Sequence, residues 1–84
     1  MINYVNIVLK HILYQQDQFL VLRKEQNHKS IQLKLFNLSG MLIGEWQQNT
    51  CQGKHNIGYL PAGVYIAEIA EKGKVAERVK LYLR

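Results

Sequence analysis

The feature that most constrains the fold is an alternation of apolar and polar residues with a period of two. Ile31, Leu33 and Leu35 alternate with Gln32, Lys34 and Phe36, which is typical of a strand with one buried face. Segments of this kind recur at spacings of about ten residues, and no helical stretch separates them from residue 19 onward. The pattern predicts six strands in an antiparallel sandwich or a small barrel.

Turn residues separate the predicted strands. The run Asn37-Leu38-Ser39-Gly40 supplies side-chain acceptors and a glycine for a tight turn, and Met41 to Gln47 is the expected returning strand. Pro61-Ala62-Gly63 is expected to form a second turn, with Gly63 at positive φ. Glu71 to Lys74 is expected to close the last hairpin, and the polar stretch from Gln48 to Lys54 indicates a loop.

The last predicted strand alternates along its whole length. One face is expected to carry apolar residues with a single break at Glu77, and the other to carry most of the basic side chains. The two faces are Val75, Glu77, Val79, Leu81 and Leu83, and Ala76, Arg78, Lys80, Tyr82 and Arg84. The strand before it, Val64 to Ala70, is apolar on both sides at first, as in the middle of a sheet. Tyr65 is expected to be a structural anchor, with its ring packed and its hydroxyl bonded near the turn.

A chain of 84 residues has room for one domain and one core. Residues 1–13 fit both a helical stripe and a strand, and the need of a sandwich for an edge partner favours the strand. We therefore expect a β-sandwich over residues 14–84, preceded by an N-terminal segment, residues 1–13, that is either an edge strand or the remnant of a preceding cargo protein. The apolar start of the chain lacks a basic leader and a cleavage site and is too short to cross a bilayer, so no signal peptide and no membrane insertion are expected.

The formal net charge is +5, and basic residues are densest near the C-terminus. A solvated strand face explains this distribution better than a nucleic-acid footprint does. Tyr82 shares a predicted face with Arg78 and Lys80, a pattern that some single-strand binders use. Aromatic residues on a polar strand face are nevertheless common as packing, so no nucleic-acid partner is expected.

No catalytic, cofactor or metal site is predicted. The three histidines, His11, His28 and His55, are far apart in the chain, without carboxylates at ligand spacing, and are expected at the surface or in loops. Cys51 is the only cysteine, so no internal disulfide can form, and a plain loop thiol is expected. The serines and carboxylates form no nucleophilic or glycosidase pattern, which argues against an enzyme.

Three motifs in a fixed order resemble a known family. The segment Leu33 to Gly40 matches a strand-and-turn motif in which Asn37 stands where aspartate is usual, and Leu60, Gly63 and Tyr65 match a Leu-x-x-Gly-x-Tyr element. A hairpin and a basic, apolar strand from Lys74 to Arg84 complete the set. Together they resemble the C-terminal sorting domain of proteins exported by the type IX (Por) secretion system of Bacteroidota. The likeness covers residues 14–84, although the prolines with which that family usually opens are missing from Leu13 to Gln18.

The resemblance implies an immunoglobulin-like sandwich of about six to seven strands and a non-enzymatic role as an address. By resemblance, the partner would be a protein, the outer-membrane translocon or sortase-like machinery, and the cargo would be secreted or held at the cell surface. The alternative is a stand-alone immunoglobulin-like interaction or adhesion module that binds protein or glycan. The oligomeric state is left open. The residues expected to form the structural and recognition motif are Asn37, Gly40, Leu60, Gly63, Tyr65, Lys74, Arg78, Lys80, Leu81 and Arg84.

Overall fold

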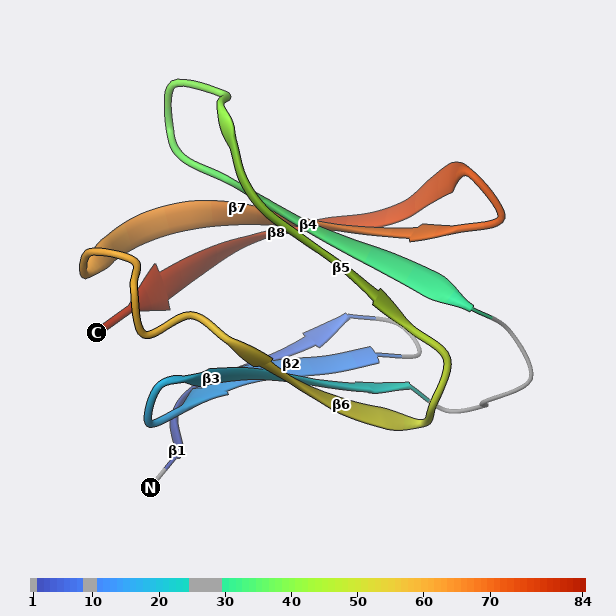
Figure 1. Ribbon diagram of the computed structural model, residues 1–84, viewed down its shortest axis with the longest axis horizontal. Helices are drawn as coiled ribbons and strands as arrows, with labels where there is room; N and C mark the ends of the chain where they lie inside the picture. The colour runs from blue at the N-terminus through green and yellow to red at the C-terminus, as the bar shows by residue number, and fades with distance from the viewer. Residues whose placement is uncertain (1, 9–10, 25–29) are drawn as a thin grey trace.

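The structure is a computed structural model that describes residues 2–8, 11–24 and 30–84. These residues form eight β-strands (Figure 1). The strands are β1 (Ile2–Val8), β2 (His11–Gln16), β3 (Phe19–Lys24), β4 (Ile31–Phe36), β5 (Leu42–Gln48), β6 (Gln52–Asn56), β7 (Gly63–Glu71) and β8 (Lys74–Leu83). The prediction of an all-β chain is confirmed.

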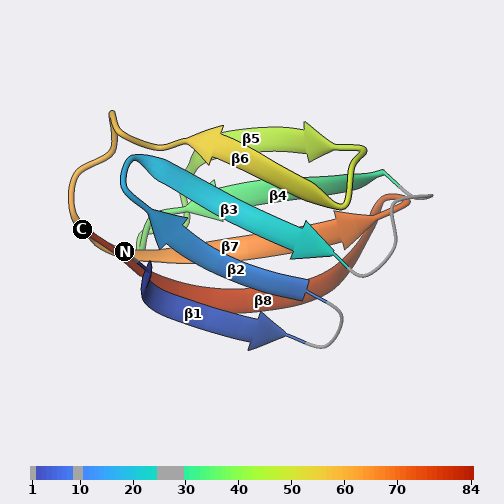
Figure 2. The same ribbon diagram turned by 90° about the horizontal axis from the view of Figure 1, so that it is seen from below.

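The strands pair into two antiparallel sheets that face each other (Figure 2). Sheet A has the order β1-β2-β3-β6, and sheet B has the order β5-β4-β7-β8. The chain crosses between the sheets after β3, β5 and β6. At one flank of the sandwich β1 lies along β8, and at the other flank β6 lies along β5 (Figure 2). This arrangement is the sandwich that the alternation predicts.

The core fills the space between the inner faces of the two sheets. Every second residue of β4 is buried there, as the alternation predicts, and Leu13, Leu20 and Leu22 face it from sheet A. The three residues Leu20 to Leu22 are all 0% exposed, so β3 is buried on both of its faces there.

Two sequence predictions about strand placement need correction. Residues 48–54 are not one loop, because β6 begins at Gln52. Gly53 lies inside this strand, and a Cβ added there would lie 2.3 Å from Gln48 Oε1. This glycine lets a strand form beneath a polar side chain, rather than breaking the strand. At the N-terminus β1 and β2 form a hairpin, so the boundary expected between residues 13 and 14 falls inside β2.

The alternation expected for the last strand is wrong at its start. Ala70 pairs with Val75, whereas Ile69 pairs with Glu77. One extra residue is therefore accommodated in β8, and a bulge of this kind reverses the faces on either side of it. Val75 is 51% exposed and lies on the outer face, while Glu77, Val79, Leu81 and Leu83 face inward.

The crossover from sheet A to sheet B is held by a turn and a tyrosine. The hydrogen-bonded turn is Ile57 to Leu60, which lies just before the predicted Pro61-Ala62-Gly63 corner. Gly63 begins β7 with φ +155°, which agrees with the predicted positive φ. The hydroxyl of Tyr65 donates a hydrogen bond to the carbonyl oxygen of Pro61, and the ring is buried. The predicted anchoring role of Tyr65 is confirmed.

Candidate interaction surface on sheet B

An apolar band crosses the outer face of sheet B where β4 ends. Phe36 on β4 is paired with Ile66 on β7 and with Leu42 on β5, so these three side chains share one face. Leu38 and Met41 in the β4–β5 turn are 67% and 62% exposed, and Leu42 is 47% exposed. Apolar side chains exposed together in this way often mark an interaction site. The apolar band is defined as Phe36, Leu38, Met41, Leu42, Val64 and Ile66.

A row of alternating charges borders the apolar band. Lys34 is paired with Glu45 on one side and with Glu68 on the other, and Glu68 is paired with Arg78. Read across the sheet, the charges run positive, negative, positive, negative from β8 to β5. Glu68 is the most buried of the four, and Arg78 Nη2 lies 3.0 Å from its carboxylate. We call these four residues the charge row.

A shallow hollow of about 280 Å³ lies where the band meets the row. Phe36 and Ile66 line it together with Glu68 and Arg78. Asn37, Leu38 and Gly40 of the β4–β5 turn complete the lining, and Figure 1 shows this turn rising from sheet B on the side away from sheet A. The motif residues Asn37 and Gly40 of this turn therefore meet Arg78, which is far from them in the chain, at one place.

The β4–β5 turn is a rigid wall because its own groups bond one another. Asn37 Oδ1 accepts hydrogen bonds from the backbone N–H groups of Ser39 and Met41, at 3.0 Å each. Gly40 has φ +87° and donates its N–H to the carbonyl oxygen of Asn37. Asparagine and glycine were expected here for these reasons, and the turn prediction is confirmed.

The remaining motif residues have different surroundings. Lys80 is exposed and paired with Ile66, so it lies beside the hollow. Leu81 is buried opposite Tyr65, and Leu60 packs against the core. Lys74 lies at the other end of β8, at the β7–β8 turn. Arg84 is tied across the sandwich, since Gln15 bonds both its backbone N–H and its carbonyl oxygen.

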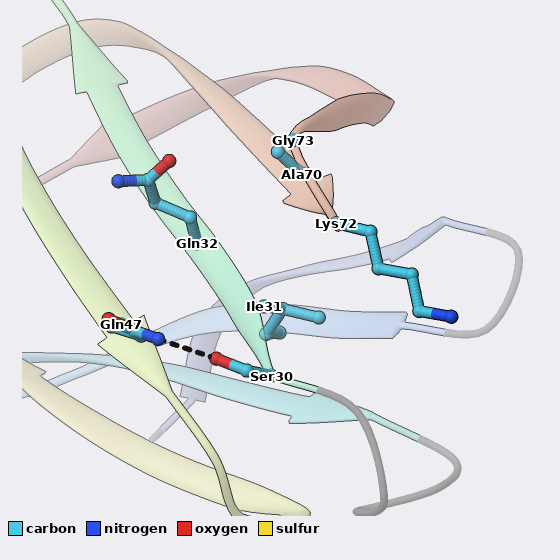
Figure 3. A pocket seen from close by; sticks show the side chains of 7 residues that line it. All are labelled: Ser30, Ile31, Gln32, Gln47, Ala70, Lys72 and Gly73. Atoms are coloured by element: carbon cyan, nitrogen blue, oxygen red, sulfur yellow. Dashed lines mark hydrogen bonds between the residues drawn. The ribbon is translucent and has the colours of Figure 1, made fainter.

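A second hollow, of about 410 Å³, lies at the opposite end of sheet B (Figure 3). Gln47 and Ser30 line it and bond each other, with Gln47 Nε2 2.8 Å from Ser30 Oγ. Lys72 extends from the β7–β8 turn away from this pair (Figure 3). Gln47 and Ser30 satisfy each other, and the amide of Gln32 bonds Glu45 outside the hollow.

The prediction that the histidines lie at the surface is wrong for two of them. His55 is 9% exposed and His11 is 4% exposed, while His28 lies outside the described residues. Gln48 Nε2 donates to the carbonyl oxygens of Leu22 and Thr50. Its Oε1 must therefore accept from His55 Nε2, at 2.9 Å. Burial lowers the pKa of His55 below its ordinary value of 6.5. The partner of His55, Gln48, comes from a different strand, so the sequence around His55 does not indicate that its ring is buried.

At the other end of the interior, two polar atoms are buried without a hydrogen-bond partner, His11 Nδ1 and Glu77 Oε1. They come from opposite sheets. Within the described part of the chain, histidine, cysteine, aspartate and glutamate form no group of three that could hold a metal ion. Cys51 is exposed, as expected. Residues 2–8, 11–24 and 30–84 contain no helix long and apolar enough to cross a membrane.

Comparison with known proteins identifies a fold. No family model and no curated protein matches the sequence. Among solved structures, the chain is similar to a DUF3244 family protein from Bacteroides vulgatus that has an immunoglobulin-like β-sandwich fold. The TM-score is 0.71 at 12% sequence identity, over 98% of this chain and 94% of that one. The likeness confirms the predicted immunoglobulin-like sandwich, with eight strands where six to seven were expected.

Proposed function

We propose that this chain is a non-enzymatic recognition domain, and that it acts as a sorting address of the type IX kind. The observation that carries the proposal is the meeting of Asn37, Gly40 and Arg78 at one hollow on sheet B. These residues come from two separate parts of the motif set that resembles the sorting domains. An address needs a surface that a partner can read rather than a reactive centre, and an apolar floor beside charged groups is such a surface.

The chemistry of the hollow supports recognition by a protein. Its floor, Phe36 and Ile66, offers apolar area for burial, and Leu38 adds an exposed side chain at the wall. The Arg78 side chain is 65% exposed although it is paired with Glu68, so it can also meet an acidic group of a partner. A rigid wall and a sheet floor give little conformational entropy to lose on binding.

The test is export of a reporter. The complete chain is fused behind a signal peptide and a reporter enzyme in a bacterium with a working type IX system, and the reporter is measured in the periplasm, on the surface and in the medium. We expect export by the unmodified chain, and retention in the periplasm for Leu38→Asp. The control is Tyr59→Asp, because Tyr59 is 65% exposed in the crossover before β7 and is not part of the hollow.

A second candidate function is a stand-alone module that binds a protein outside any export system. The exposed apolar band favours it, because such a band serves any protein partner equally well. Retention of a folded, protease-resistant reporter fusion in the periplasm, with the unmodified chain, would contradict the sorting role and favour the module.

A further inference from the structure

We propose that the outer face of sheet B binds a second copy of this chain, face to face, about a two-fold axis parallel to the strands. The inference does not depend on which partner reads the domain. It starts from the order of charges in the charge row, which is Arg78, Glu68, Lys34, Glu45 across the sheet.

The charge row is complementary to itself when it is reversed. A two-fold axis between the faces and parallel to the strands exchanges β8 with β5 and β7 with β4. Arg78 then faces Glu45 of the second copy, and Glu68 faces Lys34 of the second copy. Symmetry repeats both contacts, so all four charges of each copy meet an opposite charge.

The same operation brings most of the apolar band against the band of the second copy, while Leu42 on β5 faces the stem of Lys80 on β8 of the second copy. Ile66 faces Phe36 of the second copy, because the two residues share a row and lie on the exchanged strands β7 and β4. The raised β4–β5 turn of each copy then stands over β7 and β8 of the other, where Leu38 and Met41 can cover Val64 and the side chain of Tyr82. Leu38, Met41 and Tyr82 are among the most exposed large apolar residues of the described chain.

Two other surfaces, the edge of β8 and the outer face of sheet A, lack this complementarity. Arg78 and Lys80 lie on one face of β8. When two β8 strands pair edge to edge about their middle residues, each of these cations lies opposite itself or the other cation in the second copy, so like charges meet. On the outer face of sheet A, the central apolar residue, Val21, is 0% exposed and is therefore not available to a partner.

The area is sufficient for a weak dimer. Four strands about 4.8 Å apart, at about 3.3 Å per residue, cover roughly 400–500 Å² on each copy, given lengths of six residues in β4 and nine in β7. The turns add to this, so the total approaches the lower limit of about 1,000 Å² for a specific interface. We therefore expect a dissociation constant in the range of about 10–100 µM, more easily dissociated by salt than an apolar dimer would be.

The first experiment is sedimentation equilibrium of the complete chain over a range of concentrations. We expect the mass to rise from 9.8 kDa toward twice that value, and the dissociation constant to rise at least about tenfold for Met41→Asp, which places a carboxylate against the apolar side chains of the second copy. The control Tyr59→Asp changes a side chain of similar exposure outside the face and should leave the constant unchanged. A chain that stays monomeric up to about 1 mM would overturn the proposal, as would a dimer that Met41→Asp does not weaken.

The second experiment tests the charge pairing itself. Glu45→Lys alone places two cations opposite each other, and Arg78→Glu alone places two carboxylates opposite each other, so each variant should dimerise at least about tenfold more weakly. An equimolar mixture restores both ion pairs in the mixed dimer, which should form with nearly the original affinity. Loss of local structure in either variant would not be repaired by mixing. A mixture as weak as its components would overturn the proposed geometry, whereas failure of export in the reporter assay would leave it untouched.

Discussion

The outer faces of the two sheets solve the same problem in different ways. On sheet A, Val21 lies on the outer face but is completely buried, with Tyr14 and Lys54 as its cross-strand neighbours. The ammonium group of Lys54 lies 5.9 Å from the centre of the Phe19 ring, so its stem extends over the face. Sheet A thus covers its own apolar residues with long side chains.

Sheet B does not cover its outer face. Leu38, Met41 and Leu42 are left exposed there. Among the charged residues of sheet B, Arg78 is bound to Glu68, and Lys34 lies between Glu68 and Glu45 in the charge row. The two faces therefore differ: long side chains cover the apolar residues of sheet A, whereas the apolar band of sheet B is left exposed to solvent.

The largest expected effect comes from placing the same charge on each face. Val21→Asp buries an unpaired carboxylate and should lower the free energy of unfolding by about 3 kcal/mol or more. Leu42→Asp should lower it by less than about 1 kcal/mol, since the side chain is already half exposed. Urea denaturation of both variants, at a concentration where the chain is monomeric, measures the difference. Equal losses of unfolding free energy in the two variants would contradict the stated difference between the two faces.

A smaller effect is expected at the crossover that sets one sheet against the other. Gly63 has φ +155° and open space where a Cβ would lie, so Gly63→Ala meets no neighbour and costs only backbone strain. We expect a loss of about 1 kcal/mol in the free energy of unfolding, measured by urea denaturation. Unchanged stability would mean that the start of β7 does not constrain the sandwich.

The smallest effect is a pH dependence at the flank where β5 and β6 join the sheets. His55 is neutral in the folded chain because burial lowers its pKa, while the unfolded chain has the ordinary value of 6.5. The unfolded chain then binds the extra proton, so stability is complete above this value and is lost as the pH falls below it toward the folded pKa. Thermal unfolding between about pH 7 and pH 5 should show this slope for the original chain. His55→Gln should flatten it, and an unaltered slope would assign the effect to another group.

Much of the fold could be predicted because its signals are local. The alternation in β4, the asparagine–glycine turn and the Tyr65 anchor each depend on residues close in sequence. What escaped prediction depends on neighbours from other strands. Gly53 is required by the Gln48 side chain, His55 is buried by the same residue, and the bulge in β8 is visible only from its register with β7.

The candidate surface could be predicted in part. The motif residues Asn37, Gly40 and Arg78 were identified from sequence, and they line the hollow. The charge row was missed, because its four members come from four strands and the order of strands in sheet B is β5-β4-β7-β8. No local pattern contains that order.

The central claim is that sheet B presents the face that meets another protein, while sheet A covers its own. Backbone amide NMR spectra of the complete chain, recorded at increasing protein concentration, test it most directly. We predict concentration-dependent shifts at Lys34, Phe36, Leu42 and Ile66, with the signals of Tyr14, Val21 and Lys54 unmoved. Shifts confined to sheet A, or no shifts at any concentration, would contradict the claim.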